Sequence, residues 1–134
     1  MANRHSTPSF LAARETSWDL PAHAEAVRDS RDMVRETLTA WGLSAPVSDV
    51  LVIVSELHTN AIRYGAAPIT LRLRLTGRCL GGEVADRGTH FAPPPRPADD
   101  QENGRGLQIV AALSTGWGID PQPDGKAVWF TRCW

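Results

Sequence analysis

A carboxylate and an amide stand four residues apart in segment 56–61 (Glu-Leu-His-Thr-Asn-Ala), which places Glu56 and Asn60 on one face of a helix. Such a pair is typical of the solvated face of an amphipathic helix, and that explanation stays open. However, Val52 and Ile53 flank the polar face, so this helix is apolar over most of its circumference and should be buried. Because buried polar groups need a partner or a water-filled cleft, Glu56 and Asn60 are candidate site residues.

Glycines accompany two further polar segments. At Asp86-Arg87-Gly88 a carboxylate ends an apolar run and a glycine permits a close turn, although an ordinary β-turn explains this segment equally well. Gly104-Arg105-Gly106 leads directly into an apolar helix that begins with Leu107. Backbone N–H groups at such a helix start can hold phosphate oxygens, and the alternative is a flexible helix entry.

Hydrophobic periodicity predicts the elements that position these residues. We expect an edge strand at 9–14, a helix start at Asp19-Leu20-Pro21, helices over 22–41, 44–64 and 106–113, and strands at 69–76, 80–85, 116–119 and 126–134. Since helices and strands do not alternate strictly, the expected class is α+β. The expected architecture is a two-layer sandwich, in which three helices cover one face of a mixed, mostly antiparallel sheet.

Composition fits one domain at 9–134 after a flexible leader at 1–8. The 134 residues, 42% of them hydrophobic, suffice for one core. Fourteen Lys and Arg against fifteen Asp and Glu give a formal charge of −1, so we expect no direct nucleic-acid or membrane partner. Without an apolar signal segment or a run of about 18 apolar residues, the expected location is the cytoplasm.

Two residue types could indicate other sites, and we interpret both as structural. Cys79 and Cys133 lie far apart without metal-binding spacing, so we expect reduced packing residues rather than a disulfide. His58 falls in the apolar stripe of the 44–64 helix, and we expect a core or interface histidine rather than a metal ligand. Residues 92–103 contain four prolines and three carboxylates and predict a surface loop.

The order of the segments resembles that of the histidine-kinase-like (GHKL, or Bergerat-fold) ATPases: Glu-x-x-x-Asn-Ala on a helix, Asp-x-Gly after a strand, a polar loop, and Gly-x-Gly-Leu opening a helix. The resemblance covers the chain from about Phe10 to Trp134. The phrases Gly104-Arg105-Gly106-Leu107-x-Ile109-Val110 and Gly125-Lys126-x-Val128-Trp129-Phe130 resemble the small single-domain actinobacterial branch, which is similar to anti-sigma-factor serine kinases.

This resemblance implies ATP and Mg²⁺ as cofactors. Asn60 would ligate the ion, since an amide oxygen suits magnesium that takes most of its charge from phosphate. Glu56 would act as general base, Asp86 would accept the adenine amino group, and Gly88 would let the backbone approach the base.

By the same resemblance, the phosphate-binding part of the site would begin at a hinge and cradle formed by Gly104, Arg105, Gly106 and Leu107. Residues 92–103 would form a lid over the nucleotide, and Arg63 would lie near phosphate.

The chain departs from the family pattern at the adenine end. Thr89-His90 stand where the family has another glycine, and Lys126-Ala127 follow Gly125 where a threonine often helps to bind adenine through water. Both departures concern the residues expected to bind adenine rather than those expected to bind phosphate.

Two functions stay open. The first is an anti-sigma factor with serine/threonine protein kinase activity toward an anti-anti-sigma protein, its partners being that protein and a sigma factor, with a homodimer left open. The second is a non-catalytic, ATP-dependent protein-binding switch. Glu56 favours the enzyme, because binding alone needs no carboxylate aimed at the γ-phosphate. A histidine-kinase fragment is disfavoured, because His5 and His23 lie before the first helix or at its start.

Overall fold

A five-stranded sheet and three helices make up the computed structural model of the chain, which describes residues 12–88 and 105–134. In chain order the elements are β1 (Ala12–Leu20), α1 (Ala26–Ala40), α2 (Val47–Tyr64), β2 (Ile69–Thr76), β3 (Cys79–Asp86), α3 (Gly106–Leu113), β4 (Gly116–Gln122) and β5 (Gly125–Cys133). The leader at 1–8 and the lid at 92–103 lie outside the described residues.

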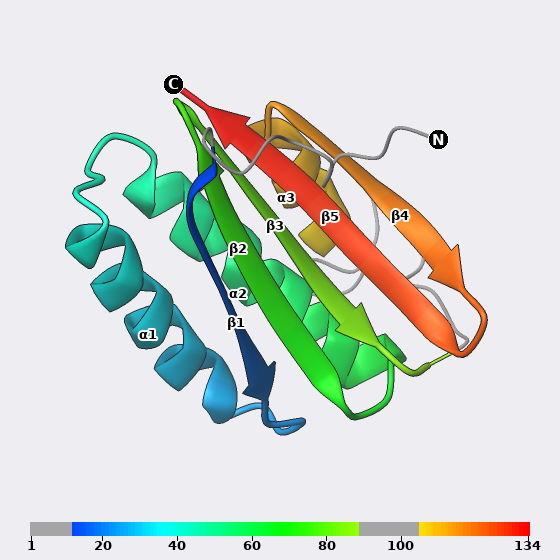
Figure 1. Cartoon of the computed structure of the whole chain (residues 1–134). Coiled ribbons are helices and arrows are strands. Elements are labelled where there is room, and N and C mark those ends of the chain that lie inside the picture. The colour runs from blue at the N-terminus through cyan, green and yellow to red at the C-terminus, as the bar shows by residue number, and fades with distance from the viewer. Residues whose placement is uncertain (1–11, 89–104) are drawn as a thin grey trace.

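The strands follow the order β1-β2-β3-β5-β4, and all four pairings between them are antiparallel. The three helices lie together on one face of this sheet (Figure 1). The predicted α+β two-layer architecture is therefore confirmed. β3 and β5, which end and begin near the predicted site, are neighbours in the sheet although α3 and β4 lie between them in sequence.

The core lies between the sheet and the helices, and its residues recur at the spacing expected for strands and helices. Every second residue of β2 is buried, from Ile69 to Leu75, because alternate side chains of a strand point to the same face. Val34 and Leu38 of α1 are fully buried one turn apart. α2 contributes most of the helical side of the core and contacts α1, α3 and β3.

The N-terminal expectations were partly wrong. A strand does occupy an edge of the sheet, but it runs over Ala12–Leu20, and Asp19-Leu20 belongs to its end rather than to a helix start. Its residues pair with β2 as far as Leu20 opposite Ile69, and Leu20 is buried in the core. Cross-strand pairing thus makes this polar segment extended, although its own sequence alternates poorly.

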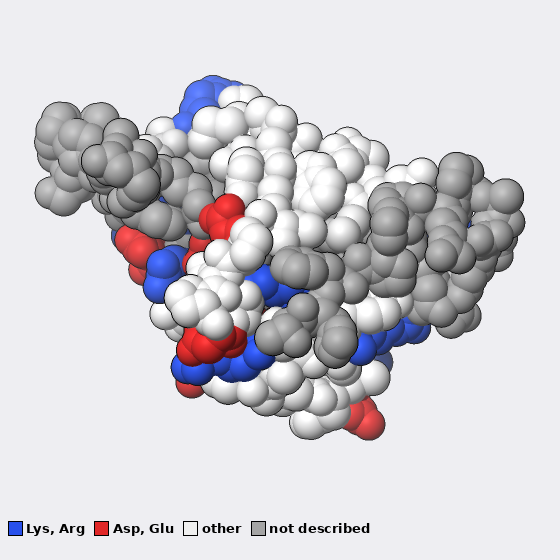
Figure 2. Space-filling model, turned by 90° about the vertical axis from the view of Figure 1, so that its right-hand side faces the viewer, with Lys and Arg blue, Asp and Glu red and all other residues white. Residues whose placement is uncertain are grey.

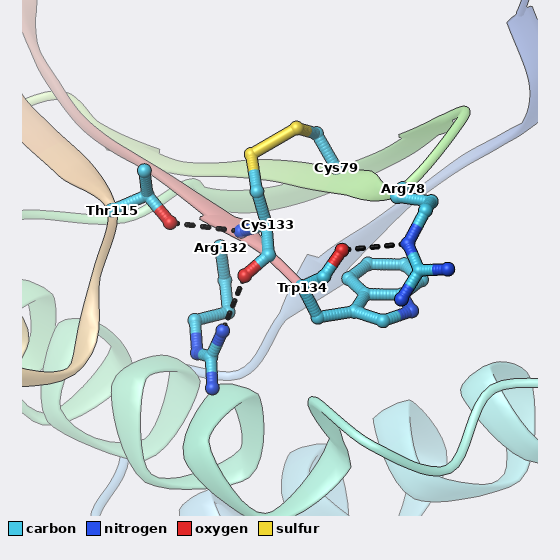
Figure 3. Close-up of a disulfide and its surroundings, with 6 residues drawn as sticks. All are labelled: Arg78, Cys79, Thr115, Arg132, Cys133 and Trp134. Carbon is cyan, nitrogen blue, oxygen red and sulfur yellow. Dashed lines mark hydrogen bonds between the residues drawn. A yellow bond between two sulfur atoms is a disulfide. The ribbon is translucent and has the colours of Figure 1, made fainter.

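The cysteine interpretation was also wrong, because Cys79 and Cys133 form a disulfide (Figure 3). The two residues are 54 positions apart in sequence but direct partners across the β3–β5 ladder. At the same end of the sheet, Arg78 Nε donates to the carbonyl of Trp134 at 2.7 Å. Tertiary pairing, which sequence spacing does not reveal, brings the thiols together.

No helix among the described residues is long and apolar enough to cross a membrane.

His58 is a core residue, as its position in the apolar stripe predicts. Its side chain is fully buried between two contacts, with Ser30 Oγ at 2.9 Å from Nδ1 and the Pro21 carbonyl at 2.9 Å from Nε2. Burial lowers the pKa of His58, and the Pro21 contact opposes that shift. The imidazole ties α2 to α1 and to the segment after β1.

We expect the free energy of unfolding to fall as the pH drops below about 6.5, because the unfolded chain then binds a proton that folded His58 resists. The slope from this one group cannot exceed about 1.4 kcal/mol per pH unit. His58→Gln should reduce this slope, as measured by urea unfolding at pH 7.5 and 5.5. Equal slopes for wild type and His58→Gln would contradict this assignment.

Candidate functional site

Residues from α2 and the start of α3 meet at one point. A Cβ atom on Gly106 would lie 3.0 Å from Glu56 Oε1 and 3.1 Å from Asn60 Oδ1. The backbone of α3 therefore begins directly against the two polar side chains of α2, and the absence of a side chain at Gly106 permits this approach. The structure thus brings together three residues that the sequence predicts for one site.

The environment of Glu56 and Asn60 is half-buried. Ile53 is fully buried as expected, but Val52 is 40% exposed, so α2 is less enclosed than its sequence suggests. Desolvation raises the pKa of Glu56, and the charge of Arg63 opposes that shift. Asn60 Nδ2 is buried, and no hydrogen-bond partner for it is found among the described residues. Such an amide fits a site whose remaining partner is a ligand.

Asp86 ends β3 with its side chain only 3% exposed. Its Oδ1 accepts the Gly88 N–H at 2.7 Å and the Lys126 ammonium at 3.0 Å. Lys126 lies directly opposite Asp86 in the β3–β5 ladder, and its side chain is 6% exposed. The carboxylate that the sequence predicts as an adenine acceptor therefore belongs to a buried ion pair.

Three glycines enclose Asp86. A Cβ on Gly65 would lie 2.4 Å from the Asp86 carboxyl carbon, and one on Gly125 would lie 1.9 Å from its carbonyl oxygen. A Cβ on Gly88 would lie 2.6 Å from the Cα of Gly65. The end of α2 is thus pressed against the turn after β3, and the Arg87 N–H donates to the Ala66 carbonyl at 2.9 Å across the same contact.

A pocket is lined both by Asn60 and by the Asp86–Lys126 pair. Its lining residues are Leu57, Asn60, Ala61, Val84, Asp86, Leu107, Ile119, Lys126 and Val128. They come from α2, β3, α3, β4 and β5, so the pocket lies between the helices and the sheet. Its wall is mostly apolar, with polar groups from Asn60, Asp86 and Lys126.

The other predicted site residues take more varied positions. Gly106 and Leu107 open α3 and are buried, whereas Arg105 precedes the helix and is exposed. Arg63 is exposed near the end of α2, close enough to influence Glu56 electrostatically. Gly104 lies outside the described residues.

Sequence reasoning missed part of the pocket. Lys126 was noted only as a departure from the family pattern, and the apolar lining was not assigned to the site: Leu57, Ala61, Val84, Ile119 and Val128. Gly65 was assigned only as a helix end. Lys126 could have been found from the register of β3 and β5, but no local pattern in the sequence sets that register.

Comparison with known proteins agrees with this geometry. Residues 20–132 match the family described as the histidine kinase-like ATPase domain. The chain belongs to this family. Its fold is similar to a solved structure of the RsbU and RsbW domains of Rv1364c from Mycobacterium tuberculosis, with a TM-score of 0.69 and 23% identity. The match covers 90% of this chain and 32% of that one, so this chain spans about a third of its neighbour. No curated protein matches significantly.

The surface of this ATPase-family domain carries charges of both signs. Figure 2 shows acidic and basic groups close together on one side of the molecule, with uncharged surface between them. Ion pairs among the described residues include Arg87 with Asp124 at 2.6 Å and Arg132 with Asp49 at 3.0 Å. This mixture accords with the formal net charge of −1.

We expect Gly65→Ala to disrupt the site, because its Cβ would overlap the carboxylate that Lys126 and Gly88 hold in place. The expected loss of stability is roughly 1–3 kcal/mol, typical of overpacking. Gly81→Ala is the matched control, since its Cβ would approach nothing closer than 3.9 Å. Urea unfolding measures both variants, and a Gly65→Ala protein as stable as Gly81→Ala would contradict the described packing around Asp86.

Proposed function

We propose that this chain is an ATP-binding regulatory protein, an anti-sigma factor that phosphorylates a serine or threonine of an anti-anti-sigma protein. The observation that carries the proposal is the meeting of Glu56, Asn60 and Gly106 at the start of α3. A helix start next to a carboxylate and a buried amide that has no partner among the described residues is suited to hold a triphosphate and its metal ion.

Each part of the site has a distinct task in this proposal. Mg²⁺, when bound with the nucleotide, would neutralise charge on the phosphates. Asn60 would supply an uncharged oxygen ligand to the ion, and the N–H groups at the start of α3 would face phosphate oxygens. The apolar lining around Leu57 and Val128 would cover the faces of the base, whose amino group would donate to Asp86.

Glu56 would act as the general base. The substrate hydroxyl would transfer its proton to the carboxylate while its oxygen attacks the γ-phosphorus, and ADP would leave with the electron pair of the broken bond. Burial raises the pKa of Glu56, which makes this carboxylate a stronger base than an exposed one. Arg63 limits that increase, because its positive charge favours the ionised form of the carboxyl.

The partners belong to the proposal as well. Support comes from the sequence segments Gly104–Val110 and Gly125–Phe130, which resemble the actinobacterial branch, and from the likeness of the fold to a structure that contains an RsbW domain. A sigma factor would bind in competition with the anti-anti-sigma protein, and a homodimer is compatible with either complex.

A second candidate function is the non-catalytic switch, in which ATP changes only the partner-binding surface. The Asp86–Lys126 ion pair favours it, because an altered base site can retain regulation by binding without efficient turnover. The two functions differ in whether phosphate reaches the partner protein.

Asn60→Ala should abolish binding of Mg-ATP, because the metal would lose its protein ligand and the phosphates their counter-charge. Excess EDTA should weaken wild-type binding for the same reason. Isothermal titration calorimetry measures both effects, with the exposed Thr39→Ala on α1 as a control that should bind like wild type. Unchanged ATP affinity in the Asn60 variant and in EDTA would rule out the proposed metal site.

Glu56→Gln should retain ATP affinity while slowing phosphate transfer by roughly 10²–10⁴-fold, the usual contribution of a general base. Transfer of labelled phosphate from ATP to purified anti-anti-sigma proteins measures the rate, and calorimetry measures the affinity. If wild-type protein binds Mg-ATP and a partner but transfers no phosphate, the switch function replaces the kinase.

A further inference from the structure

The disulfide joins two residues that the strand register already places together. Cys79 and Cys133 lie opposite each other in the β3–β5 ladder, and the pairing continues without a shift as far as Asp86 opposite Lys126. Buried apolar side chains of both strands hold this ladder against the helices. The fold therefore keeps the two sulfur atoms close without needing the bond between them.

The size of the core indicates that the bond is not a requirement for folding. Disulfides compensate for a missing core mainly in small secreted domains, and chains below about 40 residues usually need such a cross-link. This chain has 134 residues, and its core cluster takes buried side chains from all three helices and from β1, β2, β3 and β5. A bond that the core does not need can open and close while the chain stays folded.

The disulfide lies at an end of the ladder and away from the core. Cys79 is the first residue of β3, Cys133 is the last residue of β5, and both are half-buried. The neighbouring Leu80 is buried in the core, and Arg132 reaches Asp49 on α2. Because side chains alternate along a strand, the two cysteines face the side of the sheet opposite the three helices (Figure 1). A thiol can approach a sulfur atom there more easily than in the core.

The bond strengthens a place where the ladder itself is weak. The Cα atoms of Cys79 and Cys133 are 4.0 Å apart, the spacing of a pair that exchanges no backbone hydrogen bonds. Beyond this pair, the Trp134 N–H donates to the Arg78 carbonyl at 3.0 Å, and Arg78 Nε donates to the Trp134 carbonyl at 2.7 Å (Figure 3). Strand ends open readily, so the covalent bond is the strongest link between the last residues of β5 and β3.

We propose that Cys79 and Cys133 form a reversible redox switch, which holds the end of the β3–β5 ladder together when oxidised and releases the last residues of β5 when reduced. The reductant is a dithiol, such as that of a thioredoxin-like protein. Its first thiolate attacks one sulfur atom and displaces the other as a thiolate, and its second thiol then resolves the mixed disulfide. The two cysteines gain two electrons and two protons, and the reductant leaves as a disulfide.

Release of this end acts on α2 through Arg132. This residue precedes Cys133, and its Nη2 and Nε lie 3.0 Å and 3.2 Å from Asp49 Oδ2 in the first turn of α2. An end of β5 that separates from β3 carries the guanidinium away from this carboxylate. The redox state therefore changes how firmly β5 packs against α2, and this effect does not depend on nucleotide binding.

The first experiment asks whether the bond exchanges in the folded protein. Oxidised protein is incubated without denaturant with a reduced thioredoxin, and free thiols are alkylated and counted by mass spectrometry. We expect both cysteines to be reduced while the far-ultraviolet circular dichroism stays unchanged, and oxidised dithiothreitol to restore the bond within the same chain. A bond that opens only in urea, or a reduced chain that unfolds, would identify a structural cross-link and overturn the proposal.

The second experiment measures the release itself. Hydrogen exchange of the oxidised and reduced proteins is followed by mass spectrometry over the first minutes. Amides in residues 129–134 should exchange faster in the reduced protein by about 10-fold or more, while those of β2 stay protected in both states. The double variant Cys79→Ser with Cys133→Ser is the control, because it should exchange like the reduced protein and respond to neither reagent.

Each remaining outcome decides as well. Equal exchange of residues 129–134 in the two redox states would show that the end of β5 is fixed without the bond, and would overturn the proposal. Faster exchange throughout β2 and α2 on reduction would do the same, because the bond would then hold the whole fold. If the double variant does not fold, the two redox states of the wild-type protein decide alone. Neither experiment uses a nucleotide, so each result leaves the proposed function standing.

Discussion

The antiparallel pairing of β3 with β5 is the constraint on which the rest of the structure depends. It sets Asp86 opposite Lys126 at one end of the ladder and Cys79 opposite Cys133 at the other. Between these ends, Val84 faces Val128 in the core. A shift of one residue would turn Lys126 to the other face of the sheet and leave the buried Asp86 without its cation, which is strongly destabilising. The ion pair thus favours one register as well as shaping the pocket.

α2 links this sheet to the chemistry of the site. Ile53 and Leu57 of the helix lie in the core, and Glu56 and Asn60, which are their neighbours on the same face, lie against the start of α3. His58 anchors the same helix to Ser30 on α1 and to the Pro21 carbonyl. These buried contacts fix the backbone of α2 against α1 and the segment after β1, and so set where its polar groups lie.

The two polar ends of the pocket differ in their electrostatics. At the end where α2 meets the start of α3, burial raises the pKa of the Glu56 carboxyl, and Asn60 has a buried amide nitrogen without a partner among the described residues. At the other end, Asp86 already has two donors on one oxygen. Binding at the first end would satisfy an unmet group, whereas binding at the second must share an existing ion pair.

The sequence by itself determined the elements whose patterns are local. The alternation of apolar and polar residues predicts the bounds of β2, Ile69–Thr76. The glycine-containing segment before the apolar run predicts those of α3, Gly106–Leu113. The spacing of Glu56 and Asn60, with the glycine motifs, was enough to predict the family. The family match over residues 20–132 confirms that prediction. These features could be predicted because the period of a helix or strand and the conformational demands of glycine act over a few residues.

Only the tertiary structure decided which distant residues meet. The Asp86–Lys126 pair, the disulfide, and the contact of Gly65 with Asp86 each join segments at least 20 residues apart. The length of β1 was likewise set by its pairing with β2 rather than by its own alternation. The physical reason is that strand register and helix packing are chosen by burial of the whole core, a sum over many contacts that no short segment of the sequence contains.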